Sequence, residues 1–301
     1  MARLASYFLQ LPLNQVESLL LMAYFRILDQ GTDPNGEVNA DWITTRPDCI
    51  IWMDGATPFG STRVSSCAND ATWFVRRFAQ VLMDHLDASV PSDTAIVAAQ
   101  QKLHREYEAL VAQAPAKPLD KPFSCLGLAR IFEKSIELVN MGDCSLLYEI
   151  DGRVASFGYS TVTDLDHEVI SAFRKLRDPT VSYAAAFDML KPKLDKNRAK
   201  RNVQFGYNVV EPTDRERIQF ERVLLPISAM GRLLAMSDGF ARAFSLYGIS
   251  TLDNIFELVE TEGVGGIISR IRSVEDSDPN AEQYPRLKLK DDASAVLFSI
   301  A

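Results

Sequence analysis

The sequence is poor in the residues that most often carry hydrolytic chemistry. Only three histidines occur among its 301 residues, and His85, His104 and His167 are far apart. This spacing gives little support to a histidine-ligated metal site or a Ser-His-Asp triad. Serines such as Ser228 lack the flanking pattern of a nucleophile elbow. The chain has no Walker loop and no Gly-x-Gly-x-x-Gly segment, so nothing indicates nucleotide binding.

Cysteine is scarce, and long apolar runs are missing. The four cysteines, Cys49, Cys67, Cys125 and Cys144, form no Cys-x-x-Cys pair, so we expect buried thiols in a reducing compartment. The apolar run in residues 15–28 is too short and too interrupted to span a bilayer, and it lacks the features of a signal peptide. We therefore expect a cytoplasmic protein without a membrane segment, in which residues 15–28 are a core element.

Positive charge is in deficit. The chain has 40 acidic and 32 basic residues, so its net charge is -8. A basic face for nucleic acid is therefore not expected. The hydrophobic fraction of 47% and the charged fraction of 24% are ordinary for a globular protein, and the length suffices for a sizeable core. We predict a single domain over residues 1–301.

Apolar residues at helical spacing predict several helices, with Asn69 as the N-cap of the first. The predicted helices cover residues 71–86, 93–112, 165–200, 240–247 and 252–272. The segment 31–36 is rich in turn residues, and the polar segment 273–284 is predicted to be a mobile loop.

Apolar runs bounded by turn residues predict strands between these helices. The predicted strands cover residues 38–43, 49–53, 125–132, 136–141, 145–150, 153–157, 203–210, 222–226, 233–236 and 293–300. Those between 125 and 157 are predicted to form one meander, with Asp151-Gly152 as a hairpin turn. Because strands and helices do not alternate strictly, we expect an α+β fold of antiparallel sheets covered by helices.

Two apolar segments end in the same way, on an aspartate followed by glycine. Residues 49–53 lead into Asp54-Gly55, and residues 233–237 lead into Asp238-Gly239. Glycine lets the backbone turn sharply, so each carboxylate is expected at the mouth of a sheet, where a metal can meet water and substrate. Asp-Gly is also a common turn, so one such pair alone does not indicate a site.

Three further aspartates extend this set. Asp41 lies in the first predicted hairpin, Asp143 in a tight turn of the meander, and Asp291 directly before the last strand. Hard cations such as Mg²⁺ and Mn²⁺ take oxygen ligands. Several aspartates at strand ends, without histidine, are typical of a site for a pair of such ions.

In their order along the chain, these motifs resemble those of metal-dependent protein phosphatases of the 2C type. The resemblance runs from about residue 39 to residue 298, and Asp-Gly-Ala-Thr at 54–57 is similar to the bacterial branch, in which it replaces Asp-Gly-His. The matching motifs are Asn39-Ala40-Asp41, Met53-Asp54-Gly55-Ala56-Thr57, Gly142-Asp143-Cys144, Ser237-Asp238-Gly239 and Asp291-Asp292-Ala293-Ser294.

The resemblance implies a four-layer αββα sandwich, with two central antiparallel sheets flanked by helices and with residues 158–210 as a variable flap near the substrate. It also implies two Mn²⁺ or Mg²⁺ ions, and a possible third, that activate water for attack on a phosphomonoester. Asp41 would orient the metal-bound water. The implied metal ligands are Asp54, bridging both ions, the Gly55 carbonyl on one ion, Asp238 and Asp291 on the second, and Asp143 on a weaker third.

The sequence departs from the family pattern at three positions. Gly36 stands where the family often has a phosphate-binding arginine, Ala40 replaces an acidic residue, and Ala56 replaces a histidine. Arg46 or Arg63 could bind phosphate instead, or each could be a solvated surface arginine.

Three functions therefore remain open. The first is a phosphatase that acts on phosphoserine or phosphothreonine in a protein substrate. The second is a phosphatase-like sensor that binds metal or phosphopeptide without turnover, and a third, remoter reading is a metal-dependent hydrolase on a scaffold without paired sheets. The basic stretch 191–201 could dock an acidic phosphopeptide or form a solvated helix face. No motif indicates the substrate or the oligomeric state.

Overall fold

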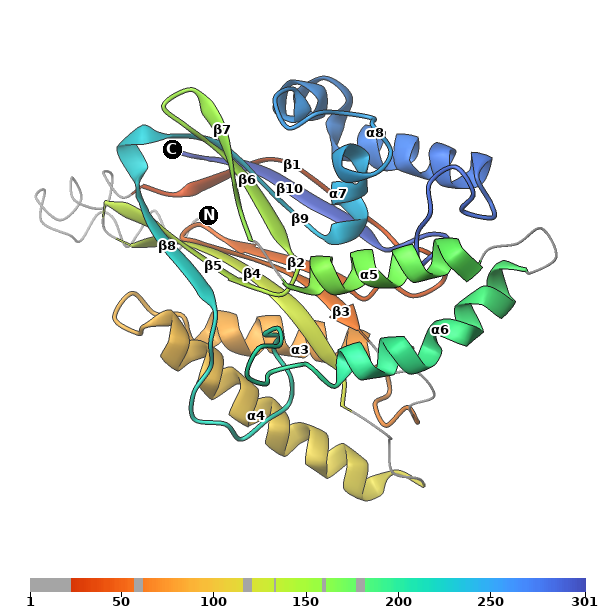
Figure 1. Ribbon diagram of the computed structural model, residues 1–301. Helices are drawn as coiled ribbons and strands as arrows, with labels where there is room; N and C mark the ends of the chain where they lie inside the picture. The colour runs from red at the N-terminus through yellow and green to blue at the C-terminus, as the bar shows by residue number, and fades with distance from the viewer. Residues whose placement is uncertain (1–22, 57–61, 116–120, 133, 159–160, 177–181) are drawn as a thin grey trace, which may run out of the picture.

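The computed structural model describes residues 23–56, 62–115, 121–132, 134–158, 161–176 and 182–301. Within these ranges the strands form two antiparallel sheets of five strands each, stacked face to face (Figure 1). The first sheet has the order β1 (Phe25–Asp33), β10 (Ala293–Ile300), β9 (Met230–Met236), β6 (Ser145–Ile150), β7 (Arg153–Phe157). The second has the order β2 (Asp41–Arg46), β3 (Cys49–Ala56), β4 (Phe123–Phe132), β5 (Ser135–Met141), β8 (Glu221–Pro226).

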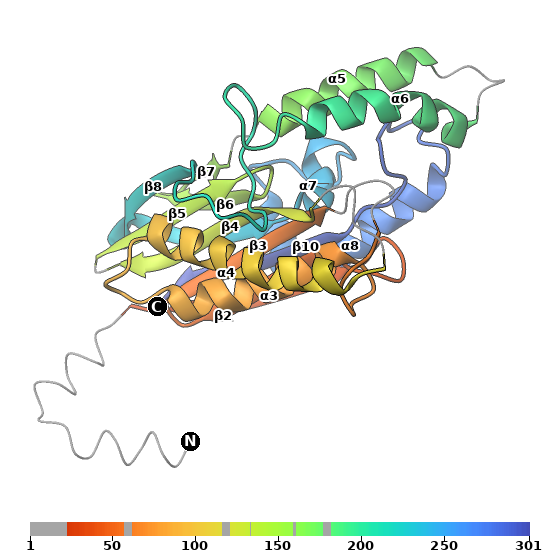
Figure 2. The same cartoon turned by 90° about the horizontal axis from the view of Figure 1, so that it is seen from below.

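Helices form the two outer layers and cover one end of the sandwich. The helices are α3 (Asp70–His85), α4 (Ser92–Gln113), α5 (Thr161–Leu176), α6 (Tyr183–Arg198), α7 (Asp238–Ser245) and α8 (Ile255–Ser277), with the short 3₁₀ helix η1 (Ile227–Ala229) between β8 and β9. Helices α3 and α4 pack on the second sheet, and α7 and α8 pack on the first. Figure 2 shows α5 and α6 as a separate pair, which has a small hydrophobic core of its own. The predicted four-layer sandwich is confirmed.

The alternation of side chains along each strand explains why the strands read as continuous apolar runs. In β3, Cys49, Ile51 and Met53 pack under α3 and α4, whereas Ile50 and Trp52 lie between the two sheets. Successive side chains of a strand point to opposite faces, so a strand covered on both faces needs apolar residues at every position. The same pattern recurs in β10.

The predicted start of the first long helix is confirmed. The side chain of Asn69 accepts a hydrogen bond from the backbone N–H of Thr72 at 2.7 Å, which satisfies one of the free donors of the first turn. A bidentate ion pair between Arg77 and Glu106 joins α3 to α4, with N···O distances of 2.7 and 2.8 Å. The two helices therefore cover the second sheet as one layer.

The predicted single meander is wrong. Strands β4 and β5 belong to the second sheet, whereas β6 and β7 belong to the first, so the chain crosses between the sheets after β5. Gly142 makes this crossing with a φ of +85°, a conformation that side chains disfavour. The predicted hairpin at Asp151-Gly152 is confirmed, since both residues have positive φ between the paired strands β6 and β7.

The predicted strand over residues 203–210 is also wrong. Only isolated bridges occur there, Arg201 to Tyr207 and Ser124 to Val210. Asn202 and Phe205 have φ values of 54° and 62°, which turn the backbone back instead of extending it. The apolar residues of this segment therefore do not share one strand face, and Phe205 is 95% exposed.

The end of α8 differs from the predicted loop as well. The helix continues to Ser277, and the following segment is held by Asp278. The Asp278 carboxylate accepts hydrogen bonds from the backbone N–H groups of Glu282, Gln283 and Tyr284 at 2.7 to 3.2 Å. Residues 278–284 are therefore a tightly bonded turn and not a loose loop.

Smaller differences concern element boundaries. β1 extends to Asp33, into the segment 31–36 predicted as a turn, and the predicted helix over 165–200 is two helices, α5 and α6. Most of the predicted core element at 15–28 lies outside the described residues, and β1 begins at Phe25. Among the helices that the structure describes, none has the length and apolar character needed to cross a bilayer.

Candidate metal centre

The apolar layer between the sheets ends in a layer of polar residues at one end of the sandwich. The alternation that places Ile50 and Trp52 between the sheets also places Asp54 there, and Asp41 is paired with Asp54 across β2 and β3. On the facing sheet, Ser237 follows β9 and Ser294 lies in β10, and their backbones are hydrogen-bonded at 3.0 Å. The site therefore draws on both sheets.

Asp41 is the most isolated carboxylate of this layer. Its residue is 3% exposed, and neither side-chain oxygen has a hydrogen-bond partner. Burial raises the pKa of Asp41 to about 8, the hydroxyls of Ser237 and Ser294 act against this, and the charges of Asp292 and Asp291 reinforce it. A buried polar atom without a partner is costly, so this carboxylate is suited to a proton or a cation.

Asp238 is brought to Asp291 by a close approach of two backbones. It begins α7, and a Cβ atom on the next residue, Gly239, would lie 1.9 Å from the Asp292 carbonyl oxygen. Only glycine permits this contact. Burial favours the neutral form of Asp238, but the positive charges of Arg242 and Lys288 outweigh it and lower the pKa. One oxygen of Asp238, Oδ1, has no hydrogen-bond partner.

Asp54 lies at the centre of the carboxylates. Burial and the negative charges of Asp41 and Asp238 raise its pKa well above the usual range. The backbone N–H of the next residue, Gly55, donates to the Ala40 carbonyl at 3.1 Å, which fixes the ends of β2 and β3 together. Asp41, Asp54 and Asp238 thus crowd like charges into one small volume.

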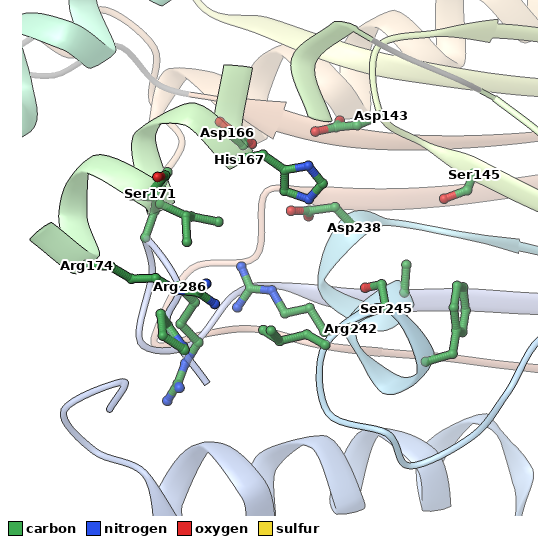
Figure 3. Close-up of a pocket in the computed structure, with 16 residues that line it drawn as sticks. Asp143, Ser145, Asp166, His167, Ser171, Arg174, Asp238, Arg242, Ser245 and Arg286 are labelled. Carbon is green, nitrogen blue, oxygen red and sulfur yellow. The ribbon is translucent and has the colours of Figure 1, made fainter. Parts of the chain in front are cut away.

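Asp143, in the turn between β5 and β6, and Asp166, on α5, face the same volume as Asp238. Burial, followed by the charge of Asp238, raises the pKa of Asp143 to about 6. Burial, followed by the charges of Asp143 and Asp238, raises the pKa of Asp166 to about 7. Figure 3 shows the three side chains around one space. Asp166 lies on α5 outside any sequence motif and was therefore not predicted as a site residue.

Two cavities open onto the carboxylates other than Asp41, which lines a separate cavity beside β1 and β2. The smaller, of about 200 Å³, lies under α6 and is lined by residues that include Asp54, Asp143, Asp238, Lys288 and Asp291. The larger, of about 600 Å³, lies between α5 and α7 and shares Asp143, Asp166, Asp238 and Arg242 with the smaller one (Figure 3). His167, which the sequence left without a role, also lines the larger cavity.

Asp291 differs from the other carboxylates because both of its oxygens bind cationic side chains. Lys288 Nζ donates to Oδ1 and Arg242 Nη2 donates to Oδ2, each at 2.6 Å. Desolvation acts against the Lys288 ammonium, but the charges of Asp291, Asp238 and Asp54 raise its pKa well above the usual range. Neither cation was predicted from the sequence, although Arg242 follows Asp238 by one turn of α7, a spacing that places both on one helix face.

The neighbouring Asp292 carboxylate binds backbone N–H groups instead of cationic side chains. Its Oδ1 accepts from the backbone N–H of Asn35 and its Oδ2 from that of Ala40, both at 2.8 Å. These bonds tie the segment before β2 to the start of β10. Of the Asp291-Asp292 pair, one carboxylate faces the cavity and the other positions Asp41.

Comparison with known proteins finds likeness in structure only. No family model and no curated protein matches the sequence. The serine/threonine phosphatase Stp1 from Staphylococcus aureus aligns with a TM-score of 0.52 and 14% identity, over 93% of this chain and 96% of Stp1. The phosphatase PstP from Mycobacterium tuberculosis aligns with a TM-score of 0.51 and 15% identity, over 93% and 99%. The PstP catalytic domain in complex with two manganese ions gives a TM-score of 0.52 and 16% identity, over 93% and 100%.

The chain has the serine/threonine phosphatase fold. The resemblance inferred from the motifs is confirmed for the architecture, and the likeness extends over nearly the whole chain. In this phosphatase fold, Asp54 lies near the end of β3 and lines a cavity together with residues of α5 and α6.

The structure does not bring either predicted phosphate-binding arginine to the carboxylates. Arg46 ends β2, whereas Asp41 begins it, and Arg46 bonds to Asp48, to the Met83 carbonyl and to the Leu86 carbonyl. Its guanidinium therefore closes the β2–β3 turn at the opposite end of the strand. Arg63 is exposed and lines neither cavity.

The donor set fits one hard cation better than two. In the described ranges, no three carboxylate, imidazole or thiol groups stand at metal-binding distances as they are. Asp41 and Asp238 nevertheless offer unpaired buried oxygens beside the crowded Asp54. Oxygen ligands of this kind suit Mg²⁺ and Mn²⁺. Asp291 does not fit in the same way, because its two oxygens are already occupied by Lys288 and Arg242.

The raised pKa of Asp41 predicts that the metal-free protein becomes less stable as the pH rises. The folded chain keeps a proton on Asp41 up to about pH 8, whereas the unfolded chain releases it near 3.8. The contribution of Asp41 to the free energy of unfolding therefore falls between these values, by at most about 1.4 kcal/mol per pH unit, and this contribution levels off above pH 8. Urea unfolding in a chelating buffer at pH 5 to 8 measures this slope. Burial also raises the pKa of Asp54, Asp143 and Asp166, so Asp41→Asn should make the slope shallower by up to about 1.4 kcal/mol per pH unit without abolishing it. A wild-type stability that rises over this range would contradict the prediction.

Proposed function

We propose that this chain is a metal-dependent phosphatase acting on phosphoserine or phosphothreonine in proteins. The observation that carries the proposal is the cluster of buried carboxylates with unpaired oxygens at the end of a phosphatase fold. Asp54, the Gly55 carbonyl and Asp238 would hold a Mn²⁺ or Mg²⁺ ion, and Asp143, with Asp166, would hold a weaker one. Such an ion lowers the pKa of bound water and offsets the charge of the phosphate.

The side chains around the cluster would position water and substrate. Asp41, with free oxygens and a pKa of about 8, is suited to accept a hydrogen bond or a proton from the attacking water. His167 lines the larger cavity and can supply the proton that the leaving oxygen needs. Arg242 and Lys288 place positive charge in the cavity wall, where phosphoryl oxygens gather charge. In the segment 158–210, proposed as the flap, α5 and α6 cover this space.

A second candidate is a phosphatase-like protein that binds metal or phosphopeptide without turnover. The observation that favours it is the double ion pair on Asp291, a residue expected to hold metal. Ala56 also lines the smaller cavity and offers no acid at the position after Asp-Gly. Both features remove groups that catalysis would use, and they leave the other carboxylates of the cluster available to bind a ligand.

Hydrolysis of p-nitrophenyl phosphate with and without Mn²⁺ separates these candidates. The phosphatase proposal predicts turnover that requires the metal and falls by at least about 10²-fold in Asp238→Asn. Asp151→Asn is a matched control, because Asp151 also precedes a glycine but lies in the β6–β7 turn, where asparagine tolerates its positive φ. Measurable Mn²⁺ binding without turnover under any metal would reject the enzyme and support the binding protein.

A further inference from the structure

We infer that the Lys288 ammonium takes the place of one of the two metal ions, so that the site binds a single divalent ion tightly. The inference rests on the proposed metal centre and concerns how many ions this chain's own residues admit. The carboxylates of the site are of two kinds. On a paired side, both carboxylate oxygens bind cationic side chains, and on an open side, buried carboxylate oxygens have no hydrogen-bond partner.

The paired side is Asp291. Lys288 Nζ lies 2.6 Å from Oδ1 and Arg242 Nη2 lies 2.6 Å from Oδ2, so both oxygens that could bind metal hold a positive charge. Charge-assisted hydrogen bonds of this length are strong in a buried setting, and Asp291 is 3% exposed. An ion binding here must displace the ammonium and leave a cation beside itself.

The open side is Asp41, Asp54 and Asp238. Asp41 is 3% exposed with both oxygens unpartnered, and Asp238 Oδ1 is unpartnered as well. Asp54 is crowded by the negative charges of its neighbours. The excess negative charge of the site is therefore concentrated on this side, where one divalent cation would balance it.

The backbone around Lys288 is fixed from both sides. Arg286, which is 2% exposed, bonds to the Leu289 carbonyl at 2.9 Å and to Asp278 at 2.7 Å. Tyr183 of α6 donates to the Leu287 carbonyl at 2.5 Å. The Lys288 side chain is 54% exposed, but the held segment and the 2.6 Å contact with the buried Asp291 direct its ammonium to the cavity.

Mn²⁺ titration by calorimetry, together with the electron paramagnetic resonance spectrum, tests this inference without any activity measurement. The wild type is expected to bind one Mn²⁺ tightly and a second at least about 100-fold more weakly, without the spectrum of a coupled pair. Lys288→Met removes the charge and keeps the length, so the second ion should bind at least about 10-fold more tightly and couple to the first. Lys288→Arg keeps a cation and should behave as the wild type.

Lys290→Met is the matched control, because Lys290 lies two residues further on and pairs with Asp276, away from Asp291. It should leave the stoichiometry unchanged. Two ions of similar affinity in the wild type, or an unchanged second ion in Lys288→Met, would overturn the inference. A chain that binds no Mn²⁺ in either form overturns both the inference and the proposed metal centre. A second ion gained by Lys288→Met without hydrolysis in any variant supports the inference and rejects only the proposed enzyme.

Discussion

Replacing Asp54 with asparagine is expected to lower kcat/KM for a phosphomonoester by roughly 10³-fold, equivalent to ~4 kcal/mol of transition-state stabilisation. Asp54 pairs with Asp41 across β2 and β3, and its carboxylate interacts with the charges of both Asp41 and Asp238. Asparagine keeps the size of the side chain but removes the charge that attracts the ion. Steady-state kinetics with saturating Mn²⁺ measure the loss.

The same substitution should raise the stability of the metal-free protein. Asp54 is disfavoured as a carboxylate by burial and by the neighbouring negative charges, so a neutral amide relieves this repulsion. At pH 8 in a chelating buffer, the thermal midpoint of Asp54→Asn should exceed that of the wild type, and the two should converge in acid. Asp151→Asn serves again as the control. Retained activity, or a lower midpoint at pH 8, would show that Asp54 has a different role.

Replacing Arg286 with methionine is expected to lower the free energy of unfolding by about 3 to 5 kcal/mol. Arg286 is 2% exposed and donates to the Asp278 carboxylate and to the carbonyl groups of Tyr284, Leu289 and Asp278. Methionine fills much of the same volume but leaves the buried Asp278 carboxylate without its cationic partner, and it removes one donor from each of these carbonyl oxygens.

Urea unfolding at pH 7 measures this effect, and Arg270→Met supplies the comparison. Arg270 pairs with Glu262 on α8, but their side chains are 44% and 34% exposed, so this substitution should cost less than about 1 kcal/mol. An equal loss of unfolding free energy in the two variants would mean that Arg286 stabilises the protein no more than an exposed arginine does. Because Arg286 lies two residues before Lys288, its loss should also weaken the order of the cavity wall.

The sequence was most informative where one local pattern determines both structure and site. The Asp-Gly pairs at 54 and 238 follow buried strands, and the alternation along β3 carries Asp54 between the sheets. These features depend on neighbouring residues alone, so short motifs were enough to predict them. The order of the motifs then predicted the sandwich as a whole, which the structure confirms.

The sequence was least informative where contacts between distant segments decide the outcome. Apolar alternation predicts β5 and β6 as strands, but it does not reveal that they belong to different sheets. Lys288 and Asp166 meet the carboxylates only because a held turn and a separate helix bring them there. Neither lies in a motif, and each resembles an ordinary charged surface residue when read alone.

The division of the polar layer between the two sheets has a consequence for the life of the protein before it is fully folded. Asp41 and Asp54 come from the second sheet, whereas Asp238 and Ser294 come with the first. A nascent or damaged chain that has formed only one sheet therefore lacks part of this polar layer. Such a chain cannot assemble the site, so the proposed metal binding requires that the sandwich has closed.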